Sequence, residues 1–467
     1  MFSKYLSSTH DVCARLVGLL KPHFPYVSLL GKHVTGSSVS VATSGTDVRD
    51  TAEKQFGYVV KVYNGKCYYD YSFSYIDESN VEQLAKDIIE KGQPTEAMEK
   101  DHVKTKILDD EPLVKEFSRE QEGKPYAIPE IVEMLTKYKD QLHSYSDKVV
   151  QAGARYENYE VSSMFISPNR DLKQNYSWCL VMAFAVCRGE KNIQFARDFT
   201  CGNNPEKCLK DLECKLEGVV RLGEELLNST LIEPGVYDII TSPSITGLIA
   251  HEAFGHGVEM DMFVKHRSKA KNYIGKRVAS DLVNMHDGAG AAYSVASYFF
   301  DDDGVLAHDT LIIKNGILQT GISDAVSAAQ LGTEPTGNGR RQDPSRKAYT
   351  RMTNTFFEPG TDKLEDMIAS VKHGYMLFET SNGMEDPKNW NIQCTAQYGR
   401  EIVDGKFTGK IVAPVVMSGY VPDLLQSISM VSSDFEVIGA GHCGKGYKEW
   451  VTVSDGGPCL KARCKLG

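Results

Sequence analysis

The chain has 467 residues, of which 41% are hydrophobic and 24% charged, and its formal net charge is −10. This is the composition of a folded protein of two or three domains, and it excludes a disordered, collagen-like or repeat chain. The acidic excess argues against a large phosphate-binding surface, because nucleic-acid affinity depends on Lys and Arg displacing counterions, so we expect no direct nucleic-acid partner.

The first elements along the chain are an amphipathic helix over residues 5–20 and strands that end in a hairpin over residues 57–75. The dipeptide Asn64-Gly65 predicts a type I′ turn in this hairpin, because both residue types tolerate positive φ angles. Ser79 and Glu82 predict a capping box for a helix that reaches about Lys91, where Gly92 and Pro94 follow. These elements predict an N-terminal α+β domain over residues 1–95.

The polar stretch 96–124 is the best candidate for a linker, and Pro129 then begins a predicted helix. Strands follow near residues 161–166 and 177–186. Asn204 and Pro205 are typical of the start of a helix, and apolar residues at a 3.6-residue period continue from there to Leu226. We therefore expect a central α+β domain over residues 96–233.

Residues 234–467 are predicted to form a large β-rich C-terminal domain. It begins with a strand over 236–240, after which Ser242-Pro243 predicts the start of a helix that carries residues 245–256. Turn signals at Asp303-Gly304, Asn315-Gly316 and Asp404-Gly405 separate strands. Short helices are expected over 323–331, 364–371 and 421–430. The expected fold class is thus α+β, with a strand-to-helix unit leading into the most unusual motif of the chain.

Eleven cysteines occur at irregular spacing without a CxxC pair, which is typical of reduced thiols. The apolar stretch 16–20 is shorter than a secretory signal, and no apolar run reaches the roughly 18 residues of a membrane span. We therefore expect a cytoplasmic protein without a membrane partner.

The most informative motif is His251-Glu252-Ala253-Phe254-Gly255-His256, an HExxxH pattern at the end of an apolar run. Two imidazoles and an adjacent carboxylate are what metal-assisted hydrolysis requires, with the histidines binding a divalent ion and Glu252 acting as base for its water. The pattern also arises by chance, with both histidines as ordinary core or surface residues.

A regular helix cannot bring these histidines together. Each residue turns a helix by about 100°, so residues five apart point roughly 140° away from each other. A π-type turn closes i to i+5 and would place both rings on one side. The motif therefore predicts a distorted helix end, with Gly255 allowing the distortion and Gly257 ending the helix.

Two histidines leave a divalent ion short of one protein ligand, with a fourth position for water. The candidates are Glu259, Asp261, His286, His308, His442 and Cys443. Cys443 is favoured because glycines around it allow close approach, a thiolate suits zinc, and Lys445 would promote its deprotonation. The plain alternative is a buried structural thiol. For Glu259 and Asp261, the alternatives are a solvated helix end or a carboxylate that orients a histidine ligand.

Two further segments carry candidate groups. Residues 335–341 form a glycine-rich turn in which Asn338 and Arg340 could bind a substrate carbonyl or carboxylate, although surface ion pairing explains them equally well. Residues 351–355 are interpreted as a strand entering the core.

Taken together, these blocks resemble the TldD/PmbA family, the TldD-type metallopeptidases formerly labelled modulators of DNA gyrase. The resemblance covers about residues 230–445 and rests on separated stretches: 251–257 with Glu259 and Asp261, 335–341, 351–355, 427–431 and 443–445. One departure is His442, which precedes the cysteine where the family usually has a small or apolar residue, so that either His442 or Cys443 could reach the ion.

The resemblance implies one zinc ion per catalytic subunit, bound by His251, His256 and Cys443, with Glu252 as catalytic base. It also implies a dimer with an identical or related subunit and a substrate that is unfolded peptide. The expected function is therefore zinc-dependent peptide hydrolysis. The alternatives are a non-catalytic protein-binding regulator with a structural ion or none, and hydrolysis of a non-peptide amide.

Overall fold

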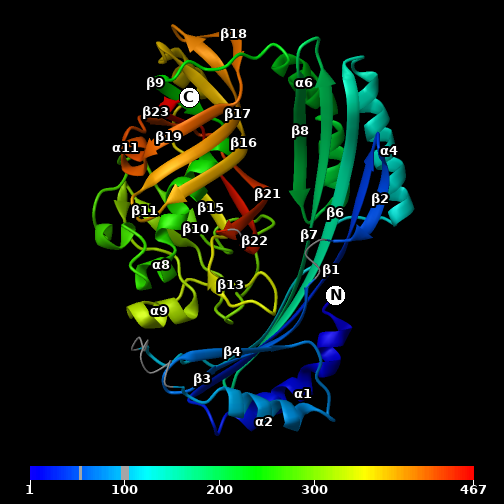
Figure 1. Ribbon diagram of the computed structural model, residues 1–467, viewed down its shortest axis with the longest axis vertical. Helices are drawn as coiled ribbons and strands as arrows, with labels where there is room; N and C mark the ends of the chain where they lie inside the picture. Colours follow the sequence, from blue (N-terminus) through cyan, green and yellow to red (C-terminus); the bar gives the residue numbers. More distant parts are fainter. Residues whose placement is uncertain (52–54, 96–104, 447) are drawn as a thin grey trace.

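Figure 1 shows the computed structural model of the chain, which describes residues 1–51, 55–95, 105–446 and 448–467. The N-terminal half is organised around one sheet of long, curved strands that runs the length of the molecule (Figure 1). Its eight strands are β1 Tyr26–Ala42, β2 Gly45–Asp50, β3 Gln55–Tyr63, β4 Tyr68–Phe73, β5 Leu113–Arg119, β6 Val149–Ile166, β7 Arg170–Arg188 and β8 Ile193–Gly202.

The strand order of this sheet is β4-β3-β1-β6-β7-β5, with β2 beside β1 and β8 beside β7. All pairs are antiparallel except β5 with β7. Two separate hydrophobic clusters cover the sheet, one involving α1 Lys4–Leu20 and α2 Val81–Lys91. The other involves α4 Ile128–Ser144, α5 Pro205–Glu213 and α6 Leu216–Leu226. Strands from both sides of residue 95 pair in this sheet, and the predicted three-domain division stays a prediction.

The C-terminal half contains two larger sheets and a small one. The seven-stranded sheet consists of β9 Gly235–Thr241, β16 His373–Asp386, β17 Asn391–Val403, β18 Lys406–Val412, β19 Val415–Tyr420, β20 Met430–Val431 and β23 Leu460–Leu466. Because β16 pairs with both β9 and β17, five of these strands close into a ring. The six-stranded sheet consists of β10 Met285–Asp287, β11 Thr310–Lys314, β12 Ile317–Leu318, β15 Asn354–Phe357, β21 Glu436–Lys445 and β22 Lys448–Gly457.

Short elements complete this half, and the predicted mixed α and β fold is confirmed at that level. The small sheet pairs β13 Gly339–Arg340 with β14 Tyr349–Thr350. The helices are α7 Pro243–Leu248, the π-helix η1 Ile249–Gly255, the 3₁₀ turn η2 His256–Val258, α8 Met260–Val264, the 3₁₀ turn η3 Ala270–Tyr273, α9 Ala325–Leu331, α10 Leu364–Ala369 and α11 Val421–Gln426.

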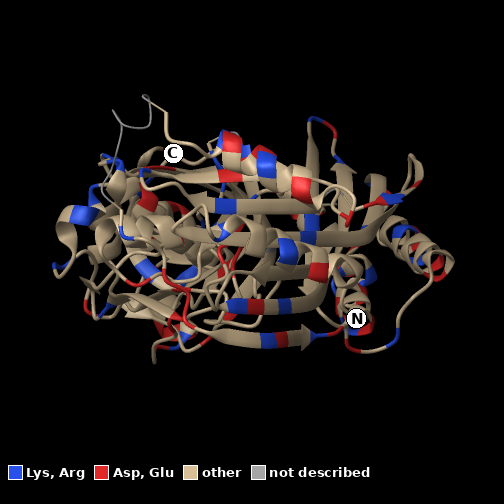
Figure 2. Ribbon diagram, turned by 90° about the horizontal axis from the view of Figure 1, so that it is seen from below, with Lys and Arg blue, Asp and Glu red and all other residues tan. Residues whose placement is uncertain are grey.

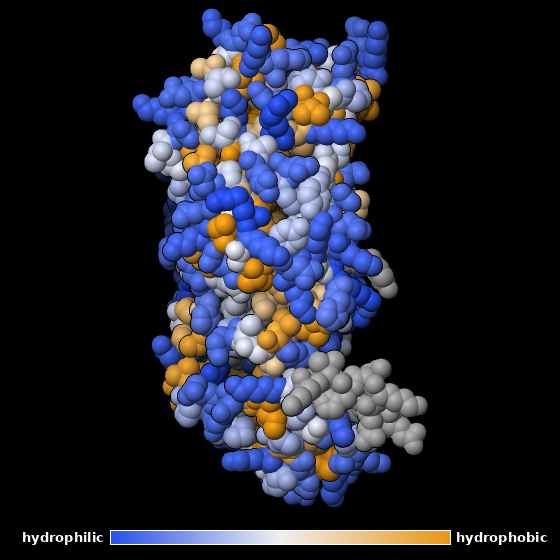
Figure 3. All heavy atoms as spheres, turned by 90° about the vertical axis from the view of Figure 1, so that its left-hand side faces the viewer, coloured by the Kyte–Doolittle hydropathy of each residue, from blue (hydrophilic) through white to orange (hydrophobic). Residues whose placement is uncertain are grey.

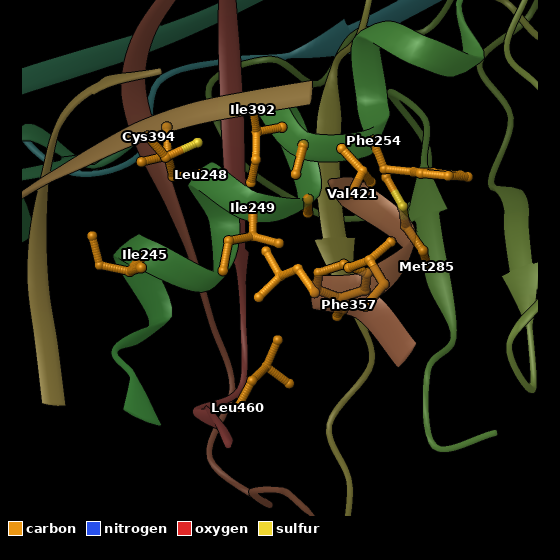
Figure 4. Packing of buried hydrophobic residues seen from close by; sticks show 14 of the residues in the cluster. Ile245, Leu248, Ile249, Phe254, Met285, Phe357, Ile392, Cys394, Val421 and Leu460 are labelled. Carbon is orange, nitrogen blue, oxygen red and sulfur yellow. The ribbon is translucent and has the colours of Figure 1, made fainter. Parts of the chain in front are cut away.

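The segment α7–η1 lies in the largest hydrophobic cluster, between the strand ring and the six-stranded sheet. Figure 4 shows its apolar side chains among those of several strands, where the labelled neighbours include Met285, Phe357, Ile392, Cys394 and Leu460. Burial of each large aliphatic side chain contributes about 1.5–3 kcal/mol, so the segment that carries the HExxxH motif is held firmly in place.

Several local predictions were wrong in detail. Four residues, 64–67, connect the paired Tyr63 and Tyr68, and Asn64 Oδ1 accepts hydrogen bonds from the amides of Lys66 and Cys67 instead of forming a type I′ turn. The predicted capping box is absent, because the helix begins at Val81 after Asn80.

Two longer segments also differ. The helix expected over 204–226 is interrupted between Glu213 and Leu216, yet both pieces bury their apolar faces in the same cluster. The predicted linker contains β5, and its residues 96–104 lie outside the described residues. By contrast, the turns Asn315-Gly316 and Asp404-Gly405 have the positive φ angles that the sequence predicts.

Positively and negatively charged residues are interspersed along the chain, as Figure 2 shows. On the face in Figure 3, hydrophobic residues occur in small groups among hydrophilic ones. Within the described residues, no helix is long and apolar enough to cross a membrane.

Candidate metal centre

The HExxxH motif lies on a π-helix, as its five-residue spacing predicts. The turn η1 covers Ile249–Gly255, and the amide of His256 donates to the carbonyl of His251, five residues earlier. This wider turn brings the two rings to a centroid distance of 5.2 Å. The predicted stop at Gly257 was wrong by one residue, because η2 continues to Val258 before Glu259 becomes extended.

Glycines in and after the motif allow close packing. A Cβ atom added to Gly255 would lie 2.2 Å from Met352 Sδ, and one added to Gly257 would lie 2.7 Å from Glu385 Oε1. A side chain at either position would therefore displace Met352 or Glu385. The absence of side chains at these two glycines lets both neighbours pack directly against the turn.

Strand β21 brings Cys443 to the two histidines. The Cys443 Sγ atom lies 3.3 Å from His256 Nε2, and one ligand atom from each of His251, His256 and Cys443 falls within 4.8 Å of the others. Of the other ligand candidates, His286 bonds instead to Asp309 and Glu358, while His308 and His442 are largely exposed. Among the described residues, these three are the group placed to hold an ion together.

The electrostatics of the cluster favour a thiolate. Burial raises the pKa of Cys443, but the adjacent His256 and His251 outweigh it and hold this pKa well below its usual range. Burial lowers the pKa of His251, while Cys443 and Glu252 raise it, with a net result of about 9. Without a metal, the cluster is therefore a thiolate beside protonated imidazoles, and a dication would replace those protons.

Glu252 faces both histidines from the same turn. Its Oε1 lies 3.9 Å from His251 Nε2 and its Oε2 lies 3.8 Å from His256 Nε2. Strand β16 passes so close that a Cβ on Gly383 would lie 2.4 Å from Glu252 Cγ. The carboxylate is therefore held beside the cluster without being bonded to it.

A second layer of charged residues surrounds His256 and Cys443. Glu259 Oε2 lies 3.4 Å from His256 Nδ1 and accepts a hydrogen bond of 2.9 Å from Lys445 Nζ. Lys445 also donates to Asp261 Oδ1 at 2.8 Å. Burial raises the pKa of Glu259, but Lys445, His256 and Arg351 outweigh it and lower this pKa, so that the carboxylate is charged. Of the two earlier interpretations of Glu259, its position matches the carboxylate that orients a histidine.

The cluster opens into a cavity of about 830 Å³. Its far wall comes from the N-terminal sheet, where β7 and β8 contribute Leu180, Met182, Arg197 and Phe199. Residues 379–385 of β16 line another side. This part of β16 has a register shift between Thr380 and Asn382 and a positive φ of 56° at Glu379, a bulge of the kind that often occurs beside active sites.

Asn338 and Arg340, predicted to bind substrate, lie elsewhere. Asn338 is fully buried, and its amide donates to Asp287 and to the Arg351 carbonyl. Arg340 donates to the Met352 carbonyl and lines a different cavity with Tyr298. Neither residue lines the cavity of the histidines, and their contact with substrate stays a prediction.

Three more residues lie at the site without having been predicted there individually. Arg351 was interpreted as part of a strand that enters the core, yet its guanidinium contacts Cys443. Glu385 and Asp455 also line the cavity, and burial raises the pKa of Asp455 to about 6. Their positions depend on pairings between strands that are distant in the chain. The spacing of residues along the sequence therefore does not predict that they lie at the site.

The residues present fit a divalent ion. Ligand atoms around a tetrahedral zinc ion lie roughly 3.3–3.6 Å apart. Cys443 Sγ and His256 Nε2 are 3.3 Å apart, and ligand atoms of all three residues lie within 4.8 Å of one another. The Nδ1 atom of His251 is buried, and no hydrogen-bond partner for it occurs in the described part of the chain. Two imidazoles with one thiolate form a donor set that suits zinc.

Comparison with known proteins assigns the class. A family model described as the PmbA/TldA metallopeptidase C-terminal domain matches residues 234–462. The chain is 31% identical over 318 residues to a metalloprotease of Methanocaldococcus jannaschii, covering 68% of this chain and 69% of that protein. It is 26% identical over 352 residues to a protein of Saccharolobus solfataricus named zinc metalloprotease TldD homolog, covering 75% and 76%.

Solved structures agree on the fold. A putative modulator of a DNA gyrase from Thermotoga maritima superposes with a TM-score of 0.76 at 17% identity, covering 98% of this chain and 100% of that one. TldE from Thermococcus kodakarensis superposes with a TM-score of 0.73 at 18% identity and the same coverage. The family model and the Methanocaldococcus jannaschii relative show that the chain belongs to the PmbA/TldD family of metallopeptidases, and the predicted enzyme class is confirmed.

Proposed function

We propose that this metallopeptidase hydrolyses unfolded peptides with one zinc ion held by His251, His256 and Cys443. The observation that carries the proposal is the convergence of three ligand atoms within 4.8 Å beside the Glu252 carboxylate. When bound there, zinc would act as a Lewis acid and lower the pKa of water from about 15.7 towards about 7. The name of the Saccharolobus solfataricus relative is consistent with zinc.

In this proposal Glu252 is the general base that transfers a proton from water to the leaving amine. Its two oxygens face the histidines, so the carboxylate can accept a proton from a water molecule at the cluster and later donate it to the leaving amine. The backbone of Gly383 packs so closely against the Glu252 side chain that a Cβ atom there would lie 2.4 Å from Glu252 Cγ. Lys445 remains paired with Glu259 and Asp261 and is not needed for proton transfer.

The cavity supports an extended peptide as substrate. Its volume of about 830 Å³ and its lining of both apolar and charged side chains suit several residues of unfolded chain. Strand β8 is the last strand beside β7, and β21 is the last strand of its sheet; the two strands contact each other, and both border the cavity. Main-chain pairing with such an edge strand gives affinity with little dependence on sequence.

We also propose a dimer. The structural similarity to TldE is consistent with a partner that is either an identical subunit or a related one.

The test uses purified protein with its metal content measured and an unstructured peptide as substrate. We expect Glu252→Gln to lower kcat by about 10²- to 10⁴-fold, the usual contribution of a general base, while zinc content remains unchanged. Glu401→Gln is the matched control, because Glu401 pairs with Lys410 outside the cavity, and it should retain full activity.

Cleavage by Glu252→Gln at the wild-type rate would refute the mechanism. A non-peptide amide is the second candidate substrate class, and including one in the assay separates the two. Hydrolysis of that amide alone would refute the peptide substrate while leaving the metal centre intact.

A further inference from the structure

Arg351 lies at the junction of the elements that carry the proposed ligands. It follows β14 and is fully buried, with an exposed fraction of 0%. A buried guanidinium is costly unless charged or polar groups surround it closely. The groups that contact the guanidinium therefore indicate its structural role.

All three nitrogens of the guanidinium face Cys443 or residues close to the proposed ligands. Nη2 donates to Cys443 Sγ and to the Cys443 carbonyl, at 2.9 Å each. Nη1 donates to the carbonyl of Glu449, on the next strand. Nε lies 3.4 Å from Glu259 Oε1, whose other oxygen lies 3.4 Å from His256 Nδ1.

The strand pairing is irregular next to Cys443, and Arg351 bonds to the hairpin at this place. The pairing of β21 with β22 shifts register between Cys443 and Lys445, and Glu449 has a positive φ of 60°. Cys443 pairs with Val451, and the regular part of the ladder ends at this thiolate-bearing residue. Arg351 bonds to both sides of this irregular turn, at Cys443 and at Glu449.

We propose that Arg351 is a positioning residue, which fixes the Cys443 thiolate against the His251–His256 pair and donates a hydrogen bond to its sulfur. This inference rests on the proposed metal centre. A planar guanidinium can bond to the sulfur and both carbonyls at once while its Nε faces Glu259, whereas a lysine ammonium is a single point of charge and cannot span them. A hydrogen bond to sulfur also withdraws electron density from the thiolate, which changes how strongly it donates to a metal.

Cobalt(II) is the probe, because a thiolate ligand gives this ion a sulfur-to-metal charge-transfer absorption band. We expect Arg351→Lys to bind cobalt about 10- to 100-fold more weakly than the wild type, the usual effect of losing an outer partner of a ligand, and to shift the energy of the band. Arg341→Lys is the matched control, since Arg341 is also buried but pairs with Asp70 and the Arg346 carbonyl. The control should keep the wild-type affinity and band.

The outcomes separate this inference from the proposed function. A wild-type protein that binds cobalt without a thiolate band would refute the metal centre itself. A wild type with the band and an Arg351→Lys variant with the same affinity and spectrum would refute only the role of Arg351. If Arg351→Lys does not fold, Arg351→Gln, which removes the buried charge, replaces it. Failure of both to fold, while Arg341→Lys folds, would assign Arg351 to stability and overturn the proposal.

Discussion

At the scale of single residues, the chemistry of the site depends on which of eleven cysteines meets the histidines. Cys443 and Cys464 are equally buried, each with an exposed fraction of 6%, yet they have opposite pKa shifts. Burial raises the pKa of Cys464 to about 11. The neighbouring histidines instead lower the pKa of Cys443. Of these two thiols, Cys443 is therefore the one prepared to act as a metal ligand.

We expect Cys443→Ser to weaken zinc binding by more than about 100-fold, beyond the effect of losing an outer partner, because a neutral hydroxyl replaces a ligating thiolate. Metal content after dialysis against a graded chelator measures this loss. Cys464→Ser is the matched control and should retain its zinc. Equal retention of zinc by both variants would exclude Cys443 from the ligand set.

At the scale of elements, the π-turn brings the two histidine rings of the HExxxH motif to the same side of the helix. It depends on Gly255, where an added methyl group would lie 2.2 Å from Met352 Sδ and 3.0 Å from the Ala250 carbonyl. We expect Gly255→Ala to lower the free energy of unfolding by about 1–3 kcal/mol, the usual cost of overpacking a core. The histidine rings should also move apart, so that zinc binding weakens as well.

Denaturant unfolding and metal titration of Gly255→Ala check both effects. The control is Gly18→Ala in α1, where an added Cβ meets nothing within 4 Å. That change should stabilise the protein slightly, by about 0.5–1 kcal/mol, because alanine favours helix more than glycine does. A Gly255→Ala protein as stable and as zinc-rich as the wild type would show that the turn tolerates a side chain.

At the scale of the whole molecule, a buried ion pair joins the N-terminal sheet to the C-terminal half. Lys61 of β3 donates to Asp303, and the side chains are only 8% and 1% exposed. Burial raises the pKa of Asp303, but Lys61 and Arg341 outweigh it and hold this pKa below the ordinary 3.8. Because the folded pKa is depressed, the stabilisation is present above pH 3.8 and disappears as the pH falls through the folded value.

We expect Lys61→Met to lower the free energy of unfolding at pH 7 by about 3–5 kcal/mol, because it leaves a buried carboxylate without its main partner. The loss should shrink as the pH falls towards 4, where protonation removes the uncompensated charge. Urea unfolding at several pH values measures this dependence. Lys61→Met with Asp303→Asn completes a double-mutant cycle, and a loss that does not vary with pH would contradict the assigned cause.

How much the sequence predicts depends on how local the feature is. The helix over 4–20, the turns at Asn315-Gly316 and Asp404-Gly405, and the π-turn of the motif all follow from residues close together in the chain. The Asn64-Gly65 turn failed because the Asn64 side chain bonded to nearby amides, a local alternative that the dipeptide alone does not reveal. The surroundings of Asn338 are likewise not visible from the sequence, because its amide donates to Asp287 of a distant strand, and its contact with substrate stays a prediction.

The sequence by itself determined the spacing of the two histidines and, through that spacing, the need for a wide helical turn, because backbone geometry follows from a few consecutive residues. Only the tertiary structure decided which distant groups meet that turn. Cys443 is 187 positions from His256, Arg351 contacts Cys443 across another long stretch of chain, and the wall of β7 and β8 belongs to a separate sheet. These groups meet because strand pairing and packing minimise the free energy of the whole chain rather than of any segment.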